Sequence, residues 1–209
     1  MAAVVEQQAV REDERRIIES FASPKPVPPS TKLTFEQATK LAGGRLFELI
    51  QGRMVFKMPD KHYAAAQGRL GGKLFVYLDA NPIGVVYPEF MLRLWPENPY
   101  EGRMPDLSVI LNEHLEEERY GSRAPDLAIE ILSRDDDKNA LFEKTRLYLE
   151  NGSRVVWIVD PFQKGVMVIT PDDRQWVTDT LSCPELLPGF SVKVQDLWAW
   201  PLAPTTAAE

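Results

Sequence analysis

The chain has 209 residues, of which 44% are apolar and 26% are charged, a balance typical of one globular domain. It contains no uninterrupted apolar run of roughly eighteen residues, so an evident membrane span is excluded. The formal net charge of −7 argues against a protein that coats nucleic acid through bulk positive charge. An acidic site that binds a cation remains compatible with it.

The first 30 residues are predicted to form an arm outside the main domain. Residues 5–21 are rich in charge but carry apolar residues that would allow a short helix, and the proline-rich stretch 23–30 would end it. The start of the chain lacks an apolar secretion core, and one cysteine cannot form an intramolecular disulfide. We therefore expect a cytoplasmic protein. The main domain is expected over 31–200, and residues 201–209 are expected to form a frayed tail.

The main domain is predicted to begin with a short helix and a hairpin. Thr34 and Gln37 have the spacing of a capping box, and the helix that they start would end near Gly43. Residues 47–59 are typical of two short strands joined by a turn. Apolar residues three and four apart then predict a helix over 62–79.

Apolar strands and a further helix alternate through the rest of the domain. Strands are predicted at 85–95, 104–110, 125–132, 154–160 and 165–170, with a helix over 139–151 and a closing segment over 184–198. This order predicts an α/β fold in which helices flank a mixed central β-sheet.

Two carboxylates fall on strands that are too apolar to lie at the surface. Alternation along 125–132 places Glu130 on the face opposite Ile129 and Ile131. Asp106 is likewise a carboxylate within an apolar strand, MPDLSVI. A buried, unpaired carboxylate is unstable by several kcal/mol, and two neighbouring ones would repel each other. Mg²⁺, held by one or two carboxylates and by water, would resolve both problems.

Pairing with arginine is the structural alternative for both carboxylates. Strand-borne acids are more often sheet-end residues that are solvated or bound to a guanidinium. Arg103, Arg123 and Arg134 are close enough in sequence to serve as partners. For either acid alone this interpretation is favoured, and for the pair together the two interpretations are about equal.

Three further residues are candidates for the same site. Lys144 shares a helical stripe with Leu141 and Tyr148, so it would either extend along the surface or reach the carboxylates and stabilise developing negative charge. Glu48 should face away from its apolar neighbours. His62 lies at a helix start and could act as a base, although a capping or surface role is the simpler interpretation.

Other catalytic motifs are missing from the sequence. It contains no GxSxG, Walker A, GxGxxG or HExxH pattern. With two histidines and one cysteine far apart, a zinc hydrolase is also disfavoured.

The ordered motifs together resemble the Uma-type restriction endonuclease family. The resemblance covers roughly residues 31–198 and rests on FELIQGRMVFKMP, His62, RMPDLSVI, APDLAIEILS, FEKTRLYLENG, RVVWIVDP and LLPGF, in that order. It implies the PD-(D/E)XK nuclease-like fold and a Mg²⁺-dependent phosphodiesterase, with Mn²⁺ as a substitute ion.

The resemblance also implies roles for individual residues. Asp106 matches the metal-binding aspartate, and Glu130 matches the acidic residue of the Glu-x-Lys element. Leu132 stands where that element has its lysine, and Lys144 on the next helix matches the position that replaces it. Two further polar positions of the family are matched by Glu48 and His62.

These observations lead to three hypotheses. The first is a metal-dependent DNA endonuclease. The second is a binding or regulatory module that keeps the nuclease scaffold without catalysis, and the third is a metal-dependent phosphodiesterase acting on RNA or nucleotides. A homodimer would suit the first, because two strands are cut most easily by two sites, and residues 5–21 could contribute to its contact.

Overall fold

The computed structural model describes residues 32–134 and 136–198. The arm expected over 1–30 and the tail expected over 201–209 lie outside the described residues, so their predictions stay predictions. The described elements are α2 (Phe35–Ala42), β1 (Phe47–Ile50), β2 (Arg53–Phe56), α3 (Lys61–Ala80), β3 (Gly84–Pro88), β4 (Leu107–Leu111), η1 (Asn112–His114), β5 (Leu127–Ile131), α4 (Lys138–Glu150), β6 (Val155–Asp160), β7 (Gly165–Ile169), β8 (Arg174–Val177), β9 (Thr180–Ser182), β10 (Ser191–Lys193) and η2 (Val194–Leu197).

A six-stranded sheet forms the centre of the molecule, in the order β3-β4-β5-β6-β7-β8. β5 and β6 run parallel, and the other neighbours are antiparallel. The parallel pair is joined through α4, as a crossover requires. The predicted mixed sheet is therefore confirmed. The carboxyl ends of β5 and β6 and the start of β4 all meet at one edge of this sheet, which we call the active edge.

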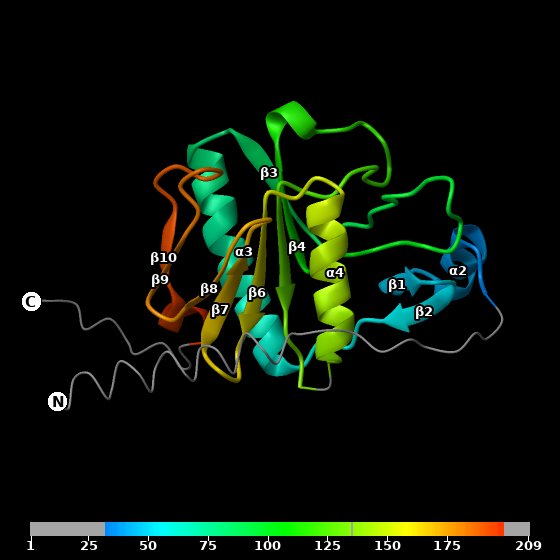
Figure 1. Ribbon diagram of the computed structural model, residues 1–209, viewed down its shortest axis with the longest axis horizontal. Coiled ribbons are helices and arrows are strands. Elements are labelled where there is room, and N and C mark those ends of the chain that lie inside the picture. The colour runs from blue at the N-terminus through cyan, green and yellow to red at the C-terminus, as the bar shows by residue number, and fades with distance from the viewer. Residues whose placement is uncertain (1–31, 135, 199–209) are drawn as a thin grey trace, which may run out of the picture.

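The two long helices cover opposite faces of the sheet. Apolar residues of α3 pack with Leu107, Ile129 and Trp157 on one face, whereas Leu141 and Tyr148 of α4 pack with the other face. Alternating side chains on β4, β5 and β6 supply both cores. Figure 1 shows α3 and α4 on either side of the sheet, and both helices begin near its lower edge, which is the active edge.

Two small sheets flank this core. The β1–β2 hairpin and α2 lie on one side in Figure 1, and β9 and β10 lie on the other. α2 begins with the expected capping box between Thr34 and Gln37 and ends at Gly43, whose φ of 59° is in the left-handed region. A third apolar cluster, which includes Phe35, Phe47 and Leu49, holds the hairpin against the loop that follows β3.

The main difference from the predicted elements concerns the segment 85–95. Its strand, β3, ends at Pro88, because Glu89 has a φ of 49°, which an extended strand cannot accommodate. β8 and β9 were not predicted, since their short segments are largely exposed and polar and carry little apolar alternation. In the described part of the chain, no helix is long and apolar enough to cross a bilayer.

Candidate active site

Asp106 and Glu130 lie opposite each other at the active edge. β4 and β5 pair in a register that sets Leu107 against Ile129, so the preceding Asp106 faces Glu130, and both side chains point to the same side. Each residue is 3% exposed. The sheet therefore brings together the two carboxylates that the sequence singled out.

Lys144 joins Glu130 to a second carboxylate. Its Nζ lies 2.8 Å from Glu130 Oε2 and 2.9 Å from Glu48 Oε2. The other oxygen of Glu130 accepts a 2.7 Å hydrogen bond from the Tyr148 hydroxyl, and Glu48 Oε1 accepts one from the backbone N–H of Met104. Lys144 thus reaches the sheet from α4, as one of its two interpretations predicted, instead of extending along the surface.

Asp106 is bound by a different lysine. Lys57, from the loop between β2 and α3, forms a close ion pair with Asp106 Oδ1. The same oxygen accepts a 2.6 Å hydrogen bond from the Tyr63 hydroxyl, and Oδ2 accepts one from the backbone N–H of Ile131. Lysine, tyrosine and backbone therefore hold Asp106 in one orientation.

Glu89 adds a fourth carboxylate. Its Oε1 accepts a 2.8 Å hydrogen bond from the Gln67 side chain. The same oxygen lies 2.9 Å from the Tyr63 hydroxyl, whose single proton it shares with Asp106. Glu89 Oε2 forms an ion pair with Lys57, with 2.8 Å between the oxygen and Nζ. Because its backbone occupies the left-handed region, Glu89 is held in a strained conformation, which is typical of functional sites.

Several of these residues were missed at the level of sequence. Lys57 lies two residues before a proline in KMP, and Glu89 directly follows one in YPE. Neither lies on a helical or strand pattern that would indicate the direction of its side chain. Tyr63 was assigned only to the apolar stripe of a helix, and Gln67 was not considered. The available signal for Lys57 was its place directly after the apolar run MVF at the end of the hairpin.

The site carries more negative than positive charge. Two ammonium groups, of Lys57 and Lys144, face four carboxylates, so the fully ionised cluster has a net charge of −2. Burial raises the pKa of Glu130 to about 7, although Lys144 opposes this effect. Burial also acts to raise the pKa of Glu48, but the nearby Lys144 and Lys57 outweigh it and the pKa is lowered.

Both lysines remain charged at neutral pH. Burial alone would lower the pKa of Lys144, but the carboxylates of Glu130 and Glu48 outweigh it, so the pKa lies above its usual value. Asp106 and Glu130 raise the pKa of Lys57 in the same way, against burial. Neither side chain is therefore suited to accept a proton, and both supply fixed positive charge.

The arginines considered as partners are engaged elsewhere. Arg103 pairs with Glu101 and donates to the carbonyl of Leu49. Arg123 donates to the carbonyl of Gly152, and the guanidinium of Arg134 lies over the ring of Phe162. The buried acids are thus paired with lysines instead of arginines.

His62 lies at the rim of the site and does not contact the carboxylates in the described structure. Its backbone N–H, with that of Tyr63, donates to Asp60, the N-cap of α3. Its ring is exposed and meets Phe162 edge to face, with 5.8 Å between centroids. The next residue, Tyr63, contacts Asp106, so His62 lies next to the site in sequence without contacting its carboxylates.

The donor set fits a hard divalent cation, although the carboxylates are not grouped as a ready-made cage. Over 32–134 and 136–198, no group of three or more His, Cys, Asp or Glu residues could hold an ion. However, Mg²⁺ commonly takes one or two carboxylates and keeps several waters. Asp106 and Glu130 provide such a pair, and the net charge of −2 favours a cation.

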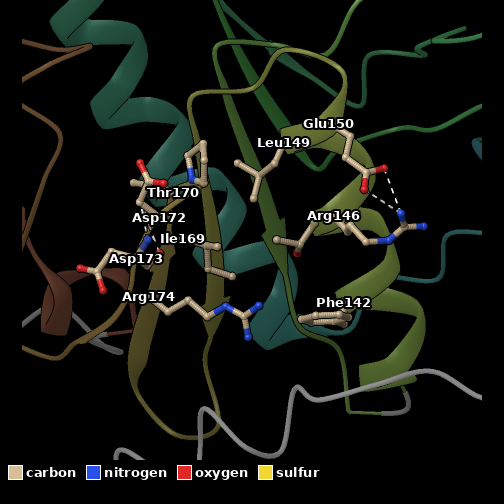
Figure 2. Close-up of a pocket in the computed structure, with 11 residues that line it drawn as sticks. Phe142, Arg146, Leu149, Glu150, Ile169, Thr170, Asp172, Asp173 and Arg174 are labelled. Carbon is tan, nitrogen blue, oxygen red and sulfur yellow. Dashed lines mark hydrogen bonds and ion pairs between the residues drawn. The ribbon is translucent and has the colours of Figure 1, made fainter.

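A separate pocket lies between α4 and the turn that joins β7 to β8. It has a volume of about 710 Å³. Figure 2 shows Phe142 and Leu149 of the helix on the side of Ile169 and Arg174 of the strands, whereas Arg146 points toward Glu150. None of the carboxylates or lysines of the active edge lines it, so it is distinct from the candidate active site.

Comparisons with known proteins agree with this architecture. The family model Uma2, described as "Putative restriction endonuclease", matches residues 34–195. A solved structure from Anabaena variabilis, described as "a putative nuclease belonging to DUF820", is 21% identical. It covers 80% of this chain and 98% of its own, with a TM-score of 0.68, and it shows that the fold is shared. No curated protein matches the sequence. The family resemblance inferred from the motifs is thereby confirmed.

Proposed function

This chain belongs to the Uma2 family of restriction endonuclease-like proteins, and on that premise we propose that it is a Mg²⁺-dependent endonuclease that hydrolyses phosphodiester bonds in DNA. One observation carries the proposal. Asp106, directly before β4, faces Glu130 on β5, and Lys144 reaches Glu130 from α4. Two acids and a lysine at one sheet edge can bind a cation and stabilise a charged phosphate.

Asp106 and Glu130 are the residues proposed to hold Mg²⁺, for which Mn²⁺ would substitute. When bound, the ion would supply Lewis-acid stabilisation of the phosphate and would make water more acidic. The chain contributes the orientation of its ligands. Tyr63 and the backbone of Ile131 fix Asp106, and Tyr148 fixes Glu130.

The lysines are proposed to act through charge. Lys144 would stabilise the negative charge that develops on the phosphate or orient the attacking water, and Glu48 would position Lys144 through their 2.9 Å contact. Lys57 would supply a second positive charge beside Asp106. His62 at the rim would contact the phosphate or relay a proton.

Nicking of supercoiled plasmid in Mg²⁺ or Mn²⁺ tests the proposal. Wild type should nick DNA, whereas Glu130→Gln and Lys144→Met should lose activity while circular dichroism shows a retained fold. Lys193→Ala, which removes an exposed lysine, is the matched control and should cut normally. Absence of metal-dependent nicking by the wild type would overturn the proposal, and preferential cleavage of RNA would move the substrate assignment to RNA or nucleotides.

One observation favours the second candidate, a nuclease-fold module without catalysis. Each carboxylate already has an ammonium partner, so the cluster is compatible with a stable fold in the absence of an ion. Metal titration separates the two candidates. If Mg²⁺ and Mn²⁺ stabilise the wild type no more than they stabilise the Asp106→Asn variant, the inactive module is the better description.

A homodimer remains part of the proposal for double-strand cleavage, because each protomer has one such site. Sedimentation at working concentration tests it, and a monomer would contradict it. Removal of residues 1–30 would show whether the arm contributes to the contact.

A further inference from the structure

Three side chains from different parts of the chain meet beside the active edge. Arg134 follows β5, Phe162 follows β6, and His62 lies in the first turn of α3. The guanidinium of Arg134 lies 5.3 Å from the centre of the Phe162 ring, and the ring of His62 meets Phe162 at an angle of 64°. We call these three residues the aromatic rim.

The Phe162 ring is held in place and yet remains accessible. The buried carboxylate of Asp160 accepts hydrogen bonds from the backbone N–H groups of Phe162 and Gln163, both at 2.9 Å. This turn fixes the backbone at Phe162, whose side chain is nevertheless 38% exposed. An aromatic side chain fixed at the surface beside a positive charge is well suited to stack against a ligand.

The aromatic rim borders the candidate active site along two chain segments. His62 directly precedes Tyr63, whose hydroxyl binds Asp106. Arg134 is three residues beyond Ile131, whose backbone N–H also binds Asp106. A nucleotide whose phosphate lay at Asp106 would therefore have its neighbours close to the rim.

We propose that the aromatic rim binds an unpaired nucleotide next to the scissile phosphate, so that the substrate is DNA with a single-stranded segment at the cut. Phe162 stacks on the base, and Arg134 and His62 contact its phosphate. In an intact duplex the bases are stacked inside the helix and do not reach a side chain at the protein surface. This inference rests on the proposed function for its substrate, but binding can be tested without cleavage.

The test measures binding of the full chain in EDTA, so that no phosphodiester bond is cut. Fluorescence anisotropy compares a labelled oligothymidylate with a blunt duplex of the same length. The variants are Phe162→Ala, Phe162→Trp and Arg134→Ala. Phe75→Ala, which removes an exposed phenylalanine near the other end of α3, is the matched control, and thermal unfolding verifies that each variant is folded.

The expected result is tighter binding of the single strand than of the duplex. Phe162→Ala should weaken single-strand binding about tenfold, while Phe162→Trp and Phe75→Ala should leave it nearly unchanged. Arg134→Ala should weaken it and reduce the salt slope by about 0.7, the value for one phosphate contact on a single strand.

Two results would overturn the inference. One is equal binding of single strand and duplex by the wild type, and the other is equal effects of Phe162→Ala and Phe75→Ala. If single-strand binding depends on Phe162 but the protein never nicks DNA, the proposed binding site at the aromatic rim is supported and only the proposed endonuclease activity is refuted.

Discussion

Lys144 Nζ lies 2.8 Å from Glu130 Oε2. Glu130 lies on β5, and Lys144 lies on α4, the helix that connects β5 to its parallel neighbour β6. Glu130 is buried in β5, and the crossover brings α4 back over the strand from which it departed. The connection itself therefore supplies the cation that Glu130 requires. Leu132, two residues after Glu130, cannot supply a positive charge, whereas Lys144 on the helix does.

Breaking this pair should strongly destabilise the protein. Lys144→Met leaves Glu130 and Glu48 buried without their shared ammonium, and we expect a loss of about 3–5 kcal/mol in the free energy of unfolding. The double variant Lys144→Met/Glu130→Gln should lose less than the sum of the two single losses. Urea unfolding measures all three.

The exposed pair between Arg146 and Glu150, on the same helix, is the control for this experiment. Arg146→Ala should cost about 0.5 kcal/mol or less. Additive losses for Lys144 and Glu130 would show that they do not interact.

The raised pKa of Glu130 predicts a pH dependence of stability in the absence of divalent ions. Burial raises this pKa from 4.5 to about 7, so between these values the folded protein holds the proton more tightly than the unfolded chain. The contribution of Glu130 is therefore largest below pH 4.5 and is lost as the pH rises through 7. Glu48, whose pKa is lowered, contributes above pH 4.5 and loses its contribution on acidification.

Urea midpoints in EDTA at pH 5 and pH 8 test this assignment. From pH 5 to pH 8 the urea midpoint of the wild type should fall relative to that of Glu130→Gln, because glutamine does not titrate. A constant difference between the two proteins would contradict the raised pKa.

Mg²⁺ should stabilise the folded protein through Asp106 and Glu130. At a concentration of 100 Kd the ion would add about 2.7 kcal/mol to the free energy of unfolding. Asp106→Asn and Glu130→Gln should lose most of this gain, as measured by the shift in melting temperature on adding Mg²⁺.

Asp126→Asn provides a matched comparison. Asp126 is also buried beside β5, but it lies at the opposite end of that strand, where it pairs with His114. This variant should keep the full response to Mg²⁺ even if its starting stability is lower. An equal loss of response in all three variants would argue against a site at the active edge.

The sequence was sufficient to predict the sheet and part of the site for a physical reason. Alternation on β5 and the helical spacing on α4 are local patterns, and they give the direction of Glu130 and of Lys144. Lys57 and Glu89 come from irregular segments, where no period relates sequence to direction. Their position depends on how the β1–β2 hairpin and the end of β3 pack against α3, which is a tertiary property.

Lys57 offers a test of how much catalysis comes from residues on irregular segments, whose positions the sequence pattern does not predict. Because its ammonium is fixed beside Asp106 and Glu89 and stays charged, it can oppose negative charge on a phosphate throughout the reaction. Lys57→Met should reduce the rate of DNA nicking by about a hundredfold or more, with a much smaller effect on DNA binding in EDTA. Lys164→Met, at an exposed turn, should change neither quantity. If Lys57→Met weakens binding and cleavage by the same factor, Lys57 acts in binding the substrate and makes no contact that strengthens in the transition state.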